Sequence, residues 1–194
     1  MKTRRPLKIT SRSSSITNAF VQAIIPFTDP APAESDAVLY FFGQVRGKTT
    51  CVYCGAPSTD WDHLRPLVRK KRPTGFLSNA NNLVPACGPC NQSKGGADWR
   101  SWMSGKARGS PRFRRVADLE ARIEKLHQFE KWGTITPLDF ESLVESEKLQ
   151  KYWGKLQEIH ELMREAQALA DGINADVREA VRYEAKSPPE QSPG

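Results

Sequence analysis

The chain has 194 residues, 38% of them hydrophobic, and a mean hydropathy of -0.58, a composition that allows a buried core in a water-exposed protein. No stretch approaches the roughly 18 consecutive apolar residues of a membrane span. The basic N-terminus lacks a cleavable signal pattern, so we expect a cytoplasmic protein that does not associate with membranes.

The formal net charge of +7 is unevenly distributed along the chain. Residues 1–115 carry 19 Lys and Arg against 6 Asp and Glu, whereas residues 116–194 carry 10 against 16. A basic folded segment attracts polyanions, so the pattern favours nucleic acid as the partner. The alternative is a solvated basic face with no partner.

Two short helices are predicted before the first cysteine. Residues 1–15 form a basic arm without acidic residues, which is typical of a segment that orders on meeting phosphates. Apolar residues then recur at helical spacing until Pro26, which ends the first helix. A second helix passes through Val38 to Phe42, and Gly43 can close it.

Further helices are predicted after the last cysteine. Trp99–Met103 is helical, and apolar spacing predicts an amphipathic helix over residues 113–132. Thr136 should cap a new helix that runs to Gly172, followed by a last helix over residues 175–186.

The four cysteines form two CxxC pairs separated by 32 residues: Cys51 with Cys54, and Cys87 with Cys90. Two such pairs can supply the four thiolates of a tetrahedral zinc site, which leaves no open position and is therefore structural. Disulfides would suit a secreted chain better, and a redox motif would not need a second copy.

The segment between the pairs contains the residues that suit phosphodiester hydrolysis. A strand should end at Asp62 and His63, a second strand should begin near Asn82, and a short helix after Cys87 should carry Asn91. The oxygens of Asp62 and Asn91 suit a hard divalent cation. The imidazole of His63, with an ordinary pKa near 6.5, suits a general base.

This order of residues within a zinc clip resembles the HNH family of ββα-metal nucleases, in its subset with two zinc knuckles, over residues 51–96. The resemblance implies that Asp62 and Asn91 hold the catalytic ion, that His63 is the base and that Asn82 braces the loop behind it. The neighbouring Asn81 is the alternative bracing residue. The family often has histidine where Asn91 stands, so we favour Mg²⁺ or Mn²⁺.

The predicted fold class is α+β: a ββα-metal (HNH) core clipped by a zinc site of four cysteines, with an N-terminal helical lead-in and a C-terminal helical region. The expected divisions are the arm and lead-in at residues 1–48, the nuclease core at 49–105, a basic linker and helical region at 106–186, and a disordered tail at 187–194.

Basic residues near this core are candidates for DNA contacts. They could position a duplex backbone, and some could reach bases in the major groove. The candidates are Arg65, Arg69, Lys70, Lys71, Arg72, Lys94, Arg112, Arg114 and Arg115.

The whole pattern also resembles small stand-alone type II HNH restriction endonucleases, which implies sequence-specific cleavage of double-stranded DNA by a homodimer. The alternatives are an HNH nuclease of a mobile element or of a multi-protein phage-defence system, and a zinc-clip DNA-binding module without catalysis. Asp62 and His63 in register with Asn91 argue against the last, because binding alone does not need that trio.

Overall fold

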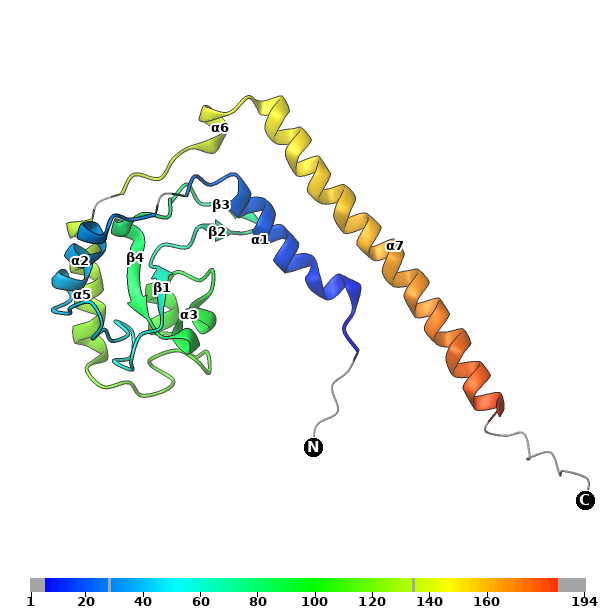
Figure 1. Ribbon diagram of the computed structural model, residues 1–194, viewed down its shortest axis with the longest axis horizontal. Helices are drawn as coiled ribbons and strands as arrows, with labels where there is room; N and C mark the ends of the chain where they lie inside the picture. The colour runs from blue at the N-terminus through cyan, green and yellow to red at the C-terminus, as the bar shows by residue number, and fades with distance from the viewer. Residues whose placement is uncertain (1–5, 28, 134, 185–194) are drawn as a thin grey trace, which may run out of the picture. The chain divides into compact units, whose positions relative to one another are not determined.

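The computed structural model describes residues 6–27, 29–133 and 135–184, and the described chain has a mixed α+β fold (Figure 1). The first five residues of the basic arm and the expected disordered tail at 187–194 lie outside the described residues. The chain divides into two compact units, which comprise residues 18–144 and residues 1–17 with 145–194. The expected boundaries near residues 48 and 105 fall inside the first of these units.

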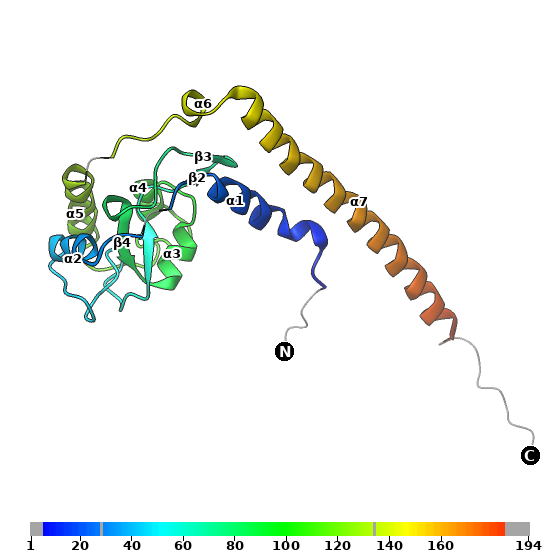
Figure 2. The same cartoon turned by 45° about the horizontal axis from the view of Figure 1, so that its top comes forward.

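A two-stranded antiparallel sheet lies at the centre of the unit formed by residues 18–144. β1 (Asp60–His63) pairs with β4 (Leu83–Ala86), and His63 lies opposite Leu83 in the register. All four residues of β4 are buried. α3 (Gly88–Lys94) follows β4 after one residue and contacts β1 (Figures 1 and 2).

Between the two central strands the chain forms a second, smaller antiparallel pair. β2 (Val68–Arg69) and β3 (Arg72–Pro73) are joined by Lys70 and Lys71, which both have positive φ, 50° and 62°. The sequence pattern predicts only a basic loop here, because strands of two residues show no detectable alternation. The 3₁₀ turn η2 (Ala80–Asn82) then leads into β4.

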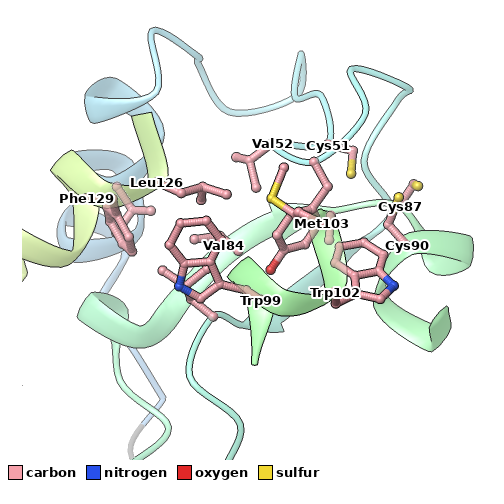
Figure 3. Close-up of a cluster of buried hydrophobic side chains, with 14 of the residues drawn as sticks. Cys51, Val52, Val84, Cys87, Cys90, Trp99, Trp102, Met103, Leu126 and Phe129 are labelled. Carbon is pink, nitrogen blue, oxygen red and sulfur yellow. The ribbon is translucent and has the colours of Figure 1, made fainter. Parts of the chain in front are cut away.

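The buried core combines residues of β4 with residues of three helices: α2 (Pro32–Phe41), α4 (Trp99–Met103) and α5 (Leu119–Trp132). Figure 3 shows Leu126 and Phe129 at one end of this cluster and the sulfur atoms of Cys51, Cys87 and Cys90 at the other. Burying one large apolar side chain contributes about 1.5–3 kcal/mol. The almost fully buried members include Tyr53, Leu64, Val84, Trp99, Met103, Leu126 and Phe129.

The helix predicted over residues 113–132 begins late, at Leu119. Arg115 and Asp118 have φ of 54° and 56°, so the backbone that precedes the helix turns instead of continuing it. Apolar spacing alone does not detect such positive φ values, because neither residue is a glycine.

The helix predicted to run from Thr136 to Gly172 begins only at Ser146, so its main part is present and its predicted start is wrong. The Leu138 amide donates to the Gly75 carbonyl at 2.9 Å, which holds this segment away from a helical path. Asp139 instead caps the short helix α6 (Phe140–Leu143), and its side chain accepts from the Glu141 amide at 3.1 Å.

The other unit contains η1 (Ile9–Arg12) and the 39-residue helix α7 (Ser146–Glu184). The Ile9 amide donates to Gln167 Oε1 at 2.6 Å, so η1 is tied to α7. α7 runs without interruption through Gly172, so the predicted break between two helices is also wrong. α1 (Ser13–Ala23) begins in this unit and ends in the other. None of the helices in the described ranges combines the length and apolar composition that a membrane-spanning segment requires.

Candidate functional site

The four cysteines converge into one cluster although the two CxxC pairs are far apart in the sequence. Their Sγ atoms all lie within 4.8 Å of one another, and Cys54 Sγ lies 3.6 Å from Cys87 Sγ. Thiolates at the corners of a zinc tetrahedron are separated by about 3.8 Å. All four cysteines are free of disulfides, so the cluster can hold a metal ion such as zinc.

Hydrogen bonding distributes charge unevenly within the cluster. The contact with Cys90 lowers the pKa of Cys51 to about 5, and the same contact raises the pKa of Cys90. Arg114 Nη1 lies 3.2 Å from Cys90 Sγ and donates to it. If a metal ion displaces the proton of Cys90, the guanidinium group would offset part of the charge of the resulting thiolate.

Asp62 is held in a buried network beside the cysteine cluster. Its Oδ2 atom accepts a 2.6 Å hydrogen bond from the Tyr53 hydroxyl and lies 3.1 Å from Lys94 Nζ. Asp62 is only 5% exposed, and burial raises the pKa of its carboxyl against the opposing effects of Lys94 and Tyr53. Both contacts involve Oδ2, and no described residue donates a hydrogen bond to Oδ1. Asp62 therefore keeps one carboxylate oxygen for a further ligand.

His63 follows Asp62 at the end of β1 and is oriented by a serine. Its Nε2 atom lies 2.8 Å from the Ser78 hydroxyl, and Lys94 Nζ donates to its backbone carbonyl at 2.9 Å. Burial, together with the nearby Lys94 cation, lowers the pKa of His63 to about 4. The ring is therefore neutral at physiological pH and able to accept a proton.

Asn82 is fully buried and connects the chain on both sides of the hairpin. Its Oδ1 accepts from the Arg65 amide at 2.8 Å, while Nδ2 donates to the carbonyls of Arg65 and Leu77 at 2.9 and 3.1 Å. The backbone of Asn82 also accepts from the Leu64 amide at 2.8 Å. The structure thus places Asn82 directly behind the residues that follow His63, whereas Asn81 is exposed.

One cavity of about 270 Å³ brings Asp62, His63 and Asn91 together. Lys94 lines it as well, on the same helix as Asn91 and one turn later. The carboxylate of Asp62 and the amide of Asn91 offer oxygen ligands, a donor set that fits Mg²⁺ or Mn²⁺. The cavity thus brings two oxygen-bearing side chains next to an imidazole that is neutral at physiological pH.

Three of the predicted DNA contacts are engaged by other groups of the protein. Lys94 is 3% exposed, and its ammonium group already contacts Asp62 and the carbonyls of His63 and Gly95. Arg65 pairs with Glu130 at 3.6 Å and is largely buried. Arg114 is exposed, but its guanidinium group donates to Cys90. Lys94 therefore neutralises a buried carboxylate, and a phosphate contact stays a prediction for all three residues.

The remaining predicted contacts are on the surface. The hairpin and the segment before α5 carry them, and each has an exposed side chain. They are Arg69, Lys70, Lys71, Arg72, Arg112 and Arg115.

Tyr53 and Ser78 are site residues that sequence reasoning misses. Tyr53 lies between the first two cysteines, where the sequence indicates only a residue of the metal-binding turn, yet its hydroxyl contacts Asp62. Ser78 precedes an asparagine-rich turn and contacts His63 from 15 residues away in the sequence. Neither contact follows from spacing, because both depend on how separate loops meet.

Scans of this chain against protein-family models, curated proteins and solved structures found no match.

Proposed function

We propose that the chain is a metal-dependent HNH endonuclease that hydrolyses phosphodiester bonds of double-stranded DNA. The single observation that carries the proposal is the cavity shared by Asp62, His63 and Asn91. The arrangement of two antiparallel strands followed by a helix, with these residues on β1 and α3, supports the assignment to the ββα-metal class.

The residues of the cavity divide the chemistry among them. A divalent ion bound by Asp62 and Asn91 would stabilise the charge that develops on the phosphate and the leaving oxygen. His63 takes the proton from an attacking water. A hydrogen bond from Nε2–H to the Ser78 hydroxyl would leave the lone pair on Nδ1 to accept this proton.

The cysteine cluster supplies structure in this proposal, not catalysis. Zinc bound by four thiolates has no position for substrate. The ion would hold the Tyr53 turn against α3, and Tyr53 in turn orients Asp62. Loss of zinc therefore disturbs the catalytic cavity indirectly.

We further propose sequence-specific cleavage of the type II restriction kind by a homodimer, acting in the cytoplasm. The surplus of basic residues over residues 1–115 supports DNA as the substrate. Exposed apolar residues along α7, among them Leu162, Leu169 and Ile173, offer a surface for a second copy.

The test is to incubate the protein with plasmid DNA and Mg²⁺ or Mn²⁺, alongside His63→Ala and the control His160→Ala. His160 lies on α7 and outside the cavity. Discrete fragments from wild type and control, lost in His63→Ala, would support the whole proposal. A smear of fragments that is lost in His63→Ala would support the nuclease activity and reject sequence-specific cleavage. DNA that is bound but uncut by all three proteins would favour the non-catalytic binding module.

A further inference from the structure

We infer that the β2–β3 hairpin enters the major groove of duplex DNA and selects the sequence presented to the catalytic cavity. This inference rests on the proposed nuclease function. It assigns to residues 68–73 a task that is separate from the chemistry of Asp62, His63 and Asn91.

The position of the hairpin supports this role. Pro66, Leu67 and Val68 line the same cavity as Asp62 and His63, so β2 begins at the rim of the proposed site. On its other side Arg69, Lys70 and Pro73 line a larger hollow of about 660 Å³. Figures 1 and 2 show β2 and β3 set apart from the β1–β4 pair. DNA gripped by the hairpin would therefore lie next to the cavity.

The charge of the hairpin suits a polyanion. Four consecutive basic residues, from Arg69 to Arg72, are all exposed. No acidic residue occurs between Asp62 and Asp98 in the sequence, so the charges of this stretch are all positive. Arginine and lysine side chains on such an element can contact phosphates and also donate to the edge of guanine.

The backbone at the tip is unfavourable for its residues. Lys70 and Lys71 are the two loop residues of the hairpin and both have positive φ. Asparagine followed by glycine is the usual solution for such a turn. Two lysines here retain charge at the expense of turn stability, a pattern typical of a functional site.

The shape favours B-form DNA over RNA. Neighbouring strands are about 4.8 Å apart, and a two-stranded ribbon fits the roughly 12 Å wide major groove of B-DNA. The major groove of an RNA duplex is too deep and narrow for such an element.

The test is the double variant Lys70→Asn/Lys71→Gly, which removes both charges and installs residues that favour the turn. Its matched control is Lys148→Gln/Lys151→Gln, two exposed lysines on α7. Binding is measured with Ca²⁺ in place of Mg²⁺, at several salt concentrations. The probes are the duplex that is cut in the plasmid assay, a scrambled duplex and an RNA duplex; if no duplex is cut, a random-sequence DNA duplex replaces the first.

We expect the hairpin variant to bind the cut duplex about tenfold more weakly or worse, and to lose much of its preference over the scrambled duplex. The plot of log affinity against log salt should become less steep, its negative slope shrinking in magnitude by about 1.8, the value for two lost phosphate contacts or their equivalent. Circular dichroism should remain unchanged, and the control should keep its preference.

Unchanged affinity and preference in the hairpin variant would overturn the inference. An equal loss in the control would also overturn it, because net charge alone would then explain the effect. If the hairpin variant loses as much affinity for the RNA duplex as for the DNA duplex, the inference that the hairpin reads the major groove of B-form DNA is rejected. Failure of the wild type to cut any DNA would count against the nuclease proposal and against sequence selection, while unequal weakening on random-sequence DNA and on the RNA duplex would still support insertion of the hairpin into the major groove.

Discussion

At the scale of single residues, the ion pair of Lys94 and Asp62 should control how strongly substitutions in the site change the free energy of unfolding. Both side chains are buried and 3.1 Å apart. We expect Lys94→Met to lower the free energy of unfolding by about 3–5 kcal/mol, because it leaves the Asp62 carboxylate buried without its cation. Urea denaturation measures this change.

The control for this prediction is the double variant Lys94→Met/Asp62→Asn. Removing both charges should recover part of the lost stability, because the remaining amide no longer carries an uncompensated charge. A double variant as unstable as the sum of the two single variants would show that the pair is not coupled.

A second prediction at this scale concerns the proton affinity of His63. Burial and the Lys94 cation lower its pKa to about 4, so the ring should stay neutral down to about pH 5. Since the folded pKa lies below the unfolded value of about 6.5, its contribution to stability is lost as the pH falls from that value toward 4. NMR titration of the histidine side chains tests this, and a midpoint close to the unfolded value for His63 would contradict it.

At the scale of elements, α7 contains a glycine that costs stability without a structural need. An added Cβ at Gly172 would meet nothing within 4 Å, and the residue lies well inside the helix. Gly172→Ala should therefore stabilise α7 by about 1 kcal/mol. Slower amide hydrogen exchange around residue 172 would verify this, and DNA cleavage should not change. Faster exchange would mean that the helix is not continuous in solution.

The elements also show which parts of a fold can be predicted from sequence. The helix ended by Gly43 and the strands leading to His63 and from Leu83 follow local patterns, so they are close to their predicted positions. The delayed start of α5 depends on positive φ at Arg115 and Asp118, and the delayed start of the helix predicted from Thr136 reflects the bond of Leu138 to Gly75. Where these helices start depends on local backbone conformation and on a long-range contact, and the spacing of apolar residues carries no information about either.

At the scale of the whole molecule, the cysteine cluster should control the stability of residues 18–144. Cys51, Cys87 and Cys90 belong to the main buried cluster, so metal at these thiols would be coupled to folding of the unit. We expect one zinc per chain by elemental analysis. A strong chelator should lower the melting temperature by about 10 °C or more, because several kcal/mol of metal binding are lost.

The control is Cys54→Ser, which removes one ligand, compared with Ser104→Ala on the surface. Loss of zinc and of stability only in the cysteine variant would agree with a structural site. A chain that contains no zinc when produced in zinc-supplemented medium, and that melts at the same temperature with chelator, would contradict it.

The candidate site is only partly predictable from sequence at this scale. The adjacency of Asp62 and His63 and the two CxxC pairs indicate which residues meet in space, since a metal clip brings distant segments together. The same reasoning names Lys94 as a DNA contact and misses its ion pair, because its position in α3 does not reveal that its ammonium group reaches Asp62. Burial of a charged side chain depends on the partner that neutralises it, and that partner comes from another element.

The contact between Arg114 and Cys90 has a consequence for the surroundings of the cluster. A zinc ion held by four thiolates carries two net negative charges, which would repel a nearby DNA backbone. Arg114 donates directly to one of these sulfurs, and three further basic residues, Lys106, Arg108 and Arg112, precede it in the sequence. With zinc bound, Arg114 would offset part of this negative charge and so lessen the repulsion of DNA that the proposed function has to overcome.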